Sequence, residues 1–335
     1  MSVESKKIFI TGANGFLGSH LCFYLADNGY DVIAAVRPNA KVSNLKHQNI
    51  KIIITDYQDN LNDIIGGADY IVHAAALLSS NFKSKREDFY KANVILTEEL
   101  LEQAIKSRKL KRFIFISSVG IYGRTGKRCA KEDRAAGKNL TDYEWSKHEA
   151  EKKCQEFHKR GAPIIILRLS QLYGPGMKYG WPKIFKEISN KKFFLIGRAE
   201  GTIQPLYIDD AVKGIKAAMM GDVDGGEIFN IAGKEIITLH NLFNQIAKLL
   251  HVDKLNTIPR WPVYLLAYFL KIIPASLKSE KLNLLTIHNI SFFCEFNCYD
   301  TIKAAKQLNF NPLVDIKEGL KNTLKWYQEN YNKHE

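Results

Sequence analysis

The alternation of short β-branched runs with helical stretches constrains the fold of this chain more than any other feature. Helical patterns lie between the runs, at 16–28, near 59–65, near 86–107 and at 141–160. Six runs rich in isoleucine, valine and phenylalanine are typical of buried parallel strands: 7–11, 31–36, 51–55, 70–75, 112–117 and 163–169. Repeated strand–helix–strand units require right-handed crossovers, so we predict an α/β fold with a doubly wound parallel (Rossmann) sheet.

The rhythm breaks after about residue 172. A loop-rich stretch follows, then strands around one helix, and the remainder has mostly helical patterns. We therefore expect a smaller, mostly helical C-terminal lobe that binds substrate. The expected division is a Rossmann domain over 1–172, to which 205–233 returns, and a substrate lobe made of 173–204 and 234–335.

The charge of the chain does not predict a nucleic-acid partner. The formal net charge is +13, but the excess is carried mostly by lysines spread along the 335 residues. Scattered lysines are typical of a solvated surface, and the sequence has no zinc-finger spacing or RNA-recognition signature. We expect the positive charge to attract anionic cofactors and substrates instead.

The cysteines and the apolar runs bear on location. Five cysteines, which are Cys22, Cys129, Cys154, Cys294 and Cys298, form no CxxC pair, and no HExxH cluster is present. This pattern predicts a reducing compartment and no bound metal, and the N-terminus has no apolar targeting segment. We expect a cytoplasmic protein. The apolar segment 261–274 is too short to span a bilayer; we favour packing within the lobe, with a lipid contact or a hydrophobic substrate wall as alternatives.

A glycine-rich motif, TGANGFLG at 11–18, directly follows the first strand pattern. Gly12 suits the tight turn, Gly15 lets backbone approach a pyrophosphate, and Gly18 lets the following helix pack close to the sheet. The free N–H groups of the helix would then meet the phosphates. The motif predicts a dinucleotide site that includes Gly12, Asn14, Gly15, Phe16, Leu17 and Gly18.

The end of the second strand pattern bears on which dinucleotide binds. A carboxylate there would bind the adenine ribose hydroxyls, whereas a cation would accept a 2′-phosphate. Val36 stands at the acid position and Arg37 follows it. This favours NADP(H), although Asn14 adds no second cation and NAD stays open.

Tyr143 and Lys147, four residues apart in a helical pattern, would share one helix face. A nearby ammonium favours the phenolate, so such a tyrosine could exchange a proton with a substrate oxygen while hydride moves to or from a nicotinamide. Ser117 and Ser118 end the fifth strand pattern, at the sheet edge that faces the ligand crevice. A hydroxyl there could bind the substrate oxygen and orient the tyrosine.

With these motifs the chain resembles the extended short-chain dehydrogenases/reductases, the NAD-dependent epimerase/dehydratase family. The match includes TGxxGxxG, HAAA at 73–76, SSVGIYG at 117–123, YxxxK at 143–147 and LRLSQLYGPG at 167–176. The resemblance implies a catalytic triad of Ser118, Tyr143 and Lys147, and a homodimer. It also implies substrate contacts from Ser118, Tyr143 and Gln171. Further cofactor contacts would come from Asp56, Tyr57, Ala74, Ala75, Ala76, Asn93, Lys147 and Leu172.

Departures from the family pattern narrow the chemistry. Val119 and Gly120 stand where dehydratases carry an acid pair, which disfavours water elimination. The sequence QPLY at 204–207 lacks an arginine that often meets a substrate diphosphate, although Arg198 and Lys178 lie in the same lobe.

We therefore predict an NAD(P)-dependent oxidoreductase acting at a secondary alcohol or ketone carbon. The favoured interpretation is an NADPH-dependent ketone reductase of the dihydroflavonol-reductase or hydroxysteroid-dehydrogenase type, as the Val-Arg-Pro end of the second strand suggests. The alternative is a nucleotide-sugar epimerase with tightly bound NAD. A lesser alternative is a non-catalytic NADP(H)-binding protein, against which the complete triad argues.

Overall fold

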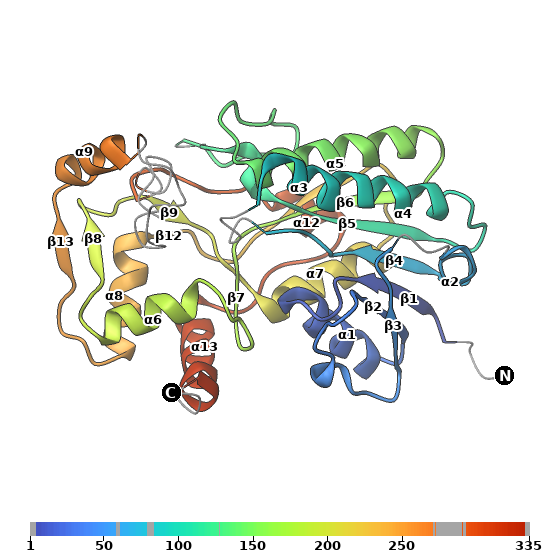
Figure 1. Ribbon diagram of the computed structural model, residues 1–335, viewed down its shortest axis with the longest axis horizontal. Coiled ribbons are helices and arrows are strands. Elements are labelled where there is room, and N and C mark those ends of the chain that lie inside the picture. Colours follow the sequence, from blue (N-terminus) through green and yellow to red (C-terminus); the bar gives the residue numbers. More distant parts are fainter. Residues whose placement is uncertain are drawn as a thin grey trace.

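A seven-stranded parallel sheet lies at the centre of the protein (Figure 1). The computed structural model describes residues 5–57, 61–78, 84–126, 128–270, 272, 290 and 293–331. The strand order is β11-β6-β5-β4-β1-β2-β3. From β1 the chain adds β2 and β3 on one side and then β4, β5, β6 and β11 on the other, which confirms the doubly wound α/β fold. The strands are β1 (Lys7–Thr11), β2 (Asp31–Val36), β3 (Ile50–Ile54), β4 (Tyr70–His73), β5 (Arg112–Ser118), β6 (Ile164–Leu169) and β11 (Ile228–Ile231).

Helices cover both faces of this sheet because successive strand residues point to opposite sides. Ile8 and Ile10 of β1 pack toward α1 (Phe16–Asp27) and α7 (Ile208–Met220), whereas Phe9 packs toward the other layer. The second layer consists of α2 (Asn62–Gly66), α3 (Arg86–Tyr90), the π-helical η2 (Lys91–Ile95), α4 (Leu96–Ala104) and α5 (Asp142–Lys159). Two short 3₁₀ segments, η1 (Ser43–Leu45) and η3 (Val119–Tyr122), follow β2 and β5.

The C-terminal lobe has a separate core rich in aromatic side chains, including Tyr173, Trp181, Phe185 and Phe243. Three two-stranded sheets brace it: β7 (Leu172–Tyr173) with β10 (Leu206–Tyr207), β9 (Thr202–Ile203) with β12 (Ile237–Thr238), and β8 (Phe194–Ile196) with β13 (Asn256–Ile258). Its helices are α6 (Trp181–Ser189), α8 (Leu239–Leu249), α9 (Arg260–Leu270) and α13 (Ile316–Tyr331).

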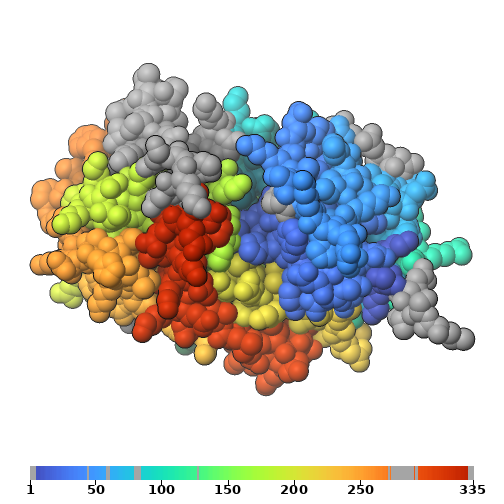
Figure 2. Space-filling view, turned by 90° about the horizontal axis from the view of Figure 1, so that it is seen from below, coloured from blue at the N-terminus to red at the C-terminus, as the bar shows by residue number. Residues whose placement is uncertain are grey.

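The C-terminal segment joins both parts of the molecule. Within α12 (Ile302–Gln307) and the residues after it, Ala304, Leu308 and Phe310 pack in the core on the α1 side of the sheet. Figure 2 shows this segment in red, with α13 against the lobe and the residues before it beside the N-terminal half. The expected division assigned all of 234–335 to the lobe, so residues 302–310 depart from it, while the division as a whole stays a prediction.

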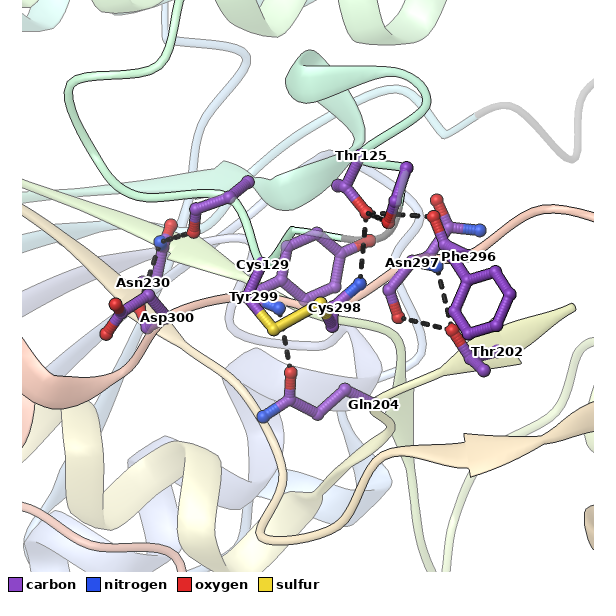
Figure 3. The surroundings of a disulfide bond; sticks show 12 residues. Thr125, Cys129, Thr202, Gln204, Asn230, Phe296, Asn297, Cys298, Tyr299 and Asp300 are labelled. Carbon is purple, nitrogen blue, oxygen red and sulfur yellow. Dashed lines mark hydrogen bonds between the residues drawn. A yellow bond between two sulfur atoms is a disulfide. The ribbon is translucent and has the colours of Figure 1, made fainter.

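Cys129 and Cys298 form a disulfide, which does not fit the reducing compartment expected from the cysteine pattern (Figure 3). The two residues are 169 positions apart, and their pairing follows from a parallel bridge between Ala130 and Tyr299. The spacing of cysteines in a sequence does not predict a disulfide between residues so far apart in the chain. Cys22, Cys154 and Cys294 are free, and the first two are buried.

Within the described ranges, no helix combines the length and the apolar character that crossing a bilayer requires. The same residues contain no group of three or more histidine, cysteine, aspartate or glutamate side chains placed to hold a metal ion.

Candidate active site

The glycine loop between β1 and α1 is closely packed at two of its glycines. A Cβ atom on Gly12, whose φ is +67°, would lie 2.8 Å from backbone atoms of Ala75. A Cβ atom on Gly18 would lie 2.1 Å from the carbonyl oxygen of Gly12. Both positions therefore require glycine: at Gly12 the loop packs against the segment that follows β4, and at Gly18 the helix packs against the backbone of the loop itself.

The N-terminus of α1 is open to an anion. Gly15 is the N-cap residue and provides no side-chain cap, and the first turn contains no acidic residue. Asn14 and Gly15 are exposed. The free N–H groups and the positive end of the helix dipole can therefore accept a pyrophosphate, and the predicted loop residues fit a dinucleotide. Phe16 and Leu17 are half-buried and pack against the lobe core, so this loop also borders the substrate side.

The adenosine side of the site is formed at the ends of β2 and β3. Arg37 and Asp56 are both exposed there. Tyr57 is buried with a φ of +70°; its hydroxyl donates to the carbonyl of Ala35 and accepts the N–H of Gly12, both at 3.3 Å. Tyr57 thus holds the glycine loop against β2. We infer that Tyr57 shapes this part of the site mainly by supporting the glycine loop from the protein interior.

A neutral histidine supports the loop after β4. Thr97 donates its hydroxyl proton to the carbonyl of Asn93 (2.6 Å), so it must accept from Nε2 of His73 (3.0 Å). Nδ1 then accepts the hydroxyl proton of Thr11 (2.7 Å), and Thr11 accepts the N–H of Ala75 (3.1 Å). Burial, with a smaller effect of Lys147, lowers the pKa of His73 to about 3. His73 is therefore a buried packing residue with both ring nitrogens hydrogen-bonded inside the protein.

Asn93 clamps this loop to the tyrosine helix. Its amide exchanges two hydrogen bonds with the backbone of Leu77 (2.7 and 3.1 Å) and donates to Ser146 Oγ (2.9 Å). Ser146 in turn donates to the carbonyl of Tyr143 (2.7 Å). Because both N–H donors of Asn93 are used within the protein, we infer that it positions the segment containing Ala74, Ala75 and Ala76.

Ser118, Tyr143 and Lys147 come together where β5 ends and α5 begins. The hydroxyl of Ser118 accepts the N–H of Gly120 (3.0 Å) and is hydrogen-bonded to the phenol of Tyr143. Ser117, the other serine considered, is buried in the sheet. Lys147 is buried, with Nζ 4.1 Å from the ring centroid of Phe115. The three predicted catalytic side chains therefore lie at one site, at the carboxyl edge of the sheet.

Burial sets the proton affinities of this pair. It lowers the pKa of Lys147 to about 8. It also raises the pKa of Tyr143 to about 12, with a further increase from the charge of Glu144 and a decrease from the Ser118 hydrogen bond. In the free protein at neutral pH, Tyr143 is therefore a protonated phenol that can donate to a substrate oxygen.

Glu144 is a site residue that the sequence analysis missed. One oxygen accepts the N–H of Thr141 (2.8 Å), which completes a capping box at the start of α5. Its other oxygen occupies the space beside Gly120, because a Cβ atom on Gly120 would lie 3.0 Å from Glu144 Oε1 and 3.2 Å from Ser118 Oγ. A carboxylate from α5 thus lies next to the triad, where the absence of a side chain at 120 leaves room.

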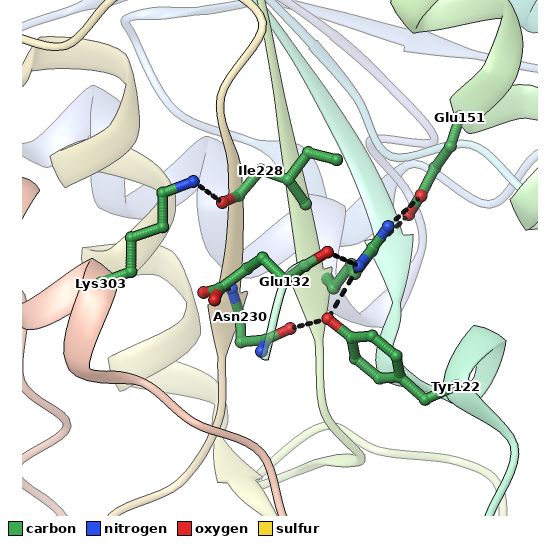
Figure 4. Close-up of polar contacts among 7 residues, drawn as sticks. Tyr122, Glu132, Glu151, Ile228, Asn230 and Lys303 are labelled. Carbon is green, nitrogen blue, oxygen red and sulfur yellow. Dashed lines mark hydrogen bonds and ion pairs between the residues drawn. The ribbon is translucent and has the colours of Figure 1, made fainter. Parts of the chain in front are cut away.

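A buried charged network holds α5 in place (Figure 4). Arg168 makes a bidentate ion pair with Glu151, with distances of 2.7 and 3.0 Å. Glu151 lies one helical turn after Lys147 on α5. Arg168 also donates to the hydroxyl of Tyr122 (2.8 Å), which donates to Asn230 of β11 (2.7 Å). The network connects α5, β6, η3 and β11, so the position of Lys147 depends on residues far apart in the sequence.

The lobe side of the crevice contains Gln171, Leu172 and Tyr299. Gln171 is exposed and hydrogen-bonded to the phenol of Tyr299. Burial raises the pKa of Tyr299, and the charge of Glu144 contributes to the increase. Leu172 in β7 is half-buried beside them. The involvement of Tyr299 could not be predicted from the sequence, because the segment that carries it is positioned by the Cys129–Cys298 disulfide and by Gln204 (Figure 3).

The chain is similar in sequence to one known protein family and to several of its members. The sequence profile of the NAD dependent epimerase/dehydratase family matches residues 8–232. A UDP-N-acetyl-alpha-D-glucosaminuronate decarboxylase of Bacillus cytotoxicus is 26% identical over 97% of this chain and 98% of that protein. An uncharacterized UDP-glucose epimerase, YtcB of Bacillus subtilis, is 30% identical over 68% of this chain and 77% of its own length.

Solved structures share the fold. The UDP-glucuronic acid 4-epimerase of Bacillus cereus in complex with NAD superposes with a TM-score of 0.78 at 24% identity, and the match covers 97% of this chain and 99% of that one. At this level of identity the likeness bears on the fold alone.

Proposed function

The chain belongs to the NAD dependent epimerase/dehydratase family and is an enzyme, and from that premise we propose that it is a nucleotide-sugar epimerase that retains its nicotinamide dinucleotide. The observation that carries the proposal is the meeting of Ser118, Tyr143 and Lys147 at the sheet edge, beside an open helix N-terminus. The similarity to these relatives supports a nucleotide-sugar substrate and does not specifically support the ketone reductase favoured from the sequence.

The proposed mechanism assigns a role to each residue of the triad. A bound nicotinamide supplies hydride transfer. Ser118 binds the oxygen of the reacting carbinol and Tyr143 holds the proton that this oxygen gains or loses. The cation of Lys147, four residues along the same helix, favours the phenolate when Tyr143 must accept that proton. The loop Gly12–Gly18 and the start of α1 bind the pyrophosphate, and Arg37 and Asp56 border the adenosine end.

Epimerisation suits the site better than water elimination. Val119 is a buried apolar side chain and Gly120 has none, so the two positions after Ser118 supply no acid or base. Glu144 provides a single carboxylate at that place, whereas elimination needs both an acid and a base. An epimerase needs no such pair, because it oxidises a carbinol and returns the same hydride to the other face.

The cofactor is the first thing to test. The protein would be purified without added nucleotide and denatured, and any released nucleotide identified by mass. We expect stoichiometric NAD. An empty protein that binds NADPH more tightly than NADH would overturn the proposal, would agree with the exposed Arg37, and would restore the ketone-reductase interpretation.

The reaction class is tested with UDP-glucose and UDP-glucuronic acid in deuterium oxide. An epimerase returns the substrate's own hydride, so we expect the epimer without deuterium on carbon. Deuterium on a carbon next to the oxidised position would indicate proton exchange and elimination chemistry. Absence of any product from these nucleotide sugars, together with reduction of simple ketones, would refute the substrate class.

A homodimer and a cytoplasmic location remain proposals. The Cys129–Cys298 disulfide is more typical of an oxidising compartment, so it weighs against the second of them. Sedimentation of the holoenzyme tests the dimer. Thiol labelling of the protein in freshly lysed cells tests whether the disulfide forms there.

A further inference from the structure

Helix α9 presents an apolar face to solvent. Trp261, Leu265, Tyr268, Phe269 and Ile272 are exposed by 71%, 50%, 61%, 57% and 77%. The first four, spaced i, i+4, i+7 and i+8, lie along one stripe of the helix, and Ile272 lies just beyond its last residue, Leu270. We call these five residues the α9 outer face. Single exposed apolar residues are ordinary, but five gathered along a helix and its end mark an interaction surface.

The opposite face of α9 is already used by the lobe. Val263 and Ala267 are buried and pack with Ile290, and Ile196 and Ile258 of the β8–β13 pair lie against the same cluster. Leu270 is also buried. The helix is therefore anchored by one side while no described residue covers the other. An anchored helix with one exposed apolar face accounts for the apolar segment 261–274 better than packing within the lobe alone does. Residues 271, 273 and 274 of that segment lie outside the described residues.

We propose that the α9 outer face binds the surface of an anionic lipid bilayer. The helix has 11 residues, so it is about 16 Å long and cannot cross a hydrocarbon core of about 30 Å. Its aromatic side chains, mixed with leucine and isoleucine, are the composition of a helix that lies in the plane of the interface. In Figure 1, α9 lies at the end of the molecule opposite the N-terminus, where it can reach a flat surface.

Charge selects this partner over a second copy of the chain. The protein carries a formal net charge of +13, so an anionic membrane attracts it before the apolar face inserts, whereas a second copy of the same charge gains no such attraction. Arg260 begins the helix, but its side chain packs against Gly197 rather than along the outer face.

The test compares two variants that change charge equally. Full-length holoenzyme would be sedimented with vesicles of phosphatidylcholine and phosphatidylglycerol in equal parts, and with vesicles of phosphatidylcholine alone. We expect stronger binding to the anionic vesicles and a loss of about tenfold or more for Phe269→Glu. The control is Leu313→Glu, on a side chain 67% exposed elsewhere in the chain, which should bind as the unaltered protein does.

A second measurement uses Trp261, one of four tryptophans. Binding should shift tryptophan emission to shorter wavelength, and Trp261→Phe should abolish the shift while vesicle binding persists. The proposal is overturned if the unaltered protein does not bind anionic vesicles, or if both glutamate variants lose binding equally. It is also overturned if the protein is a dimer that Phe269→Glu dissociates and that ignores vesicles, since the partner would then be a second copy.

Discussion

The two walls of the candidate active site are built in different ways. The nucleotide wall, formed by residues 11–18 and the loop after β4, is shaped by backbone: Gly12 and Gly18 fit because they have no side chains. The catalytic wall, formed by Ser118, Tyr143, Lys147 and Glu144, is positioned by side chains on distant segments. Arg168 reaches Glu151 from β6, and Asn93 reaches Ser146 from η2.

This difference determines how each wall can fail. A backbone-made wall tolerates changes around it but not an added Cβ atom within it. A wall held by a buried charged network fails when one partner of the network is removed, even at a residue that touches no ligand.

Tyr143→Phe should reduce turnover by about 10²- to 10⁴-fold, because the proton on the substrate oxygen then has no partner. The nucleotide wall is untouched, so the amount of dinucleotide released on denaturation should stay the same. Steady-state kinetics and nucleotide mass measure the two effects. Unchanged turnover would show that the catalytic wall lies elsewhere, and a loss of nucleotide would show that the two walls are not independent.

Arg168→Met should lower the free energy of unfolding by about 3–5 kcal/mol, because it leaves the Glu151 carboxylate buried without its partner. Urea unfolding measures this loss. The double variant Arg168→Met, Glu151→Leu removes both charges and should recover much of it. If the single variant is as stable as the unaltered protein, the network is not what holds the catalytic wall.

Removal of the disulfide should have a smaller effect. Cys129→Ser with Cys298→Ser should lower the free energy of unfolding by about 2–4 kcal/mol, since the bond closes a loop across 169 residues. Because the neighbouring Tyr299 contacts Gln171, we also expect weaker substrate binding with unchanged cofactor retention. Thermal unfolding and KM report the two parts. Cys22→Ser, at a buried free thiol, is the control for loss of a cysteine alone.

Gly18→Ala tests the nucleotide wall. The added Cβ atom would meet the carbonyl of Gly12, so we expect a loss of about 1–3 kcal/mol in stability and a released-nucleotide content well below stoichiometric. Gly66→Ala is the matched control, because a Cβ atom there has nothing within 4 Å. Equal nucleotide content in both variants would contradict the role assigned to the close loop packing.

The same division explains what the sequence could predict. The glycine loop, the strand runs and the Tyr143–Lys147 pair are local patterns, and their periodicity and spacing identify them directly. Glu144, Tyr299 and the Cys129–Cys298 disulfide depend on segments brought together over long distances in the chain, which no local pattern encodes. A signal for Glu144 was nevertheless present, because a glutamate three residues after Thr141 is a capping-box pattern that fixes where its carboxylate lies.

Glu144→Gln should have the smallest effect, a shift in pH dependence. The carboxylate of Glu144 adds to burial in raising the pKa of Tyr143, so its neutral replacement should lower that pKa. When Tyr143 accepts a proton, the rate rises with pH toward its pKa, and the midpoint of that rise should therefore move to lower pH. Glutamine keeps the cap at Thr141, so stability should change little.

The matched control is Asp142→Asn, which removes a carboxylate from the same helical turn. Asp142 lies 3.8 Å from Arg86 rather than near the triad, so the pH profile should not move. If both variants shift the midpoint equally, the effect comes from the general field at the start of α5, and Glu144 has no specific place in the site. If only Glu144→Gln does so, a residue outside the predicted triad tunes the catalytic wall from the space that Gly120 leaves.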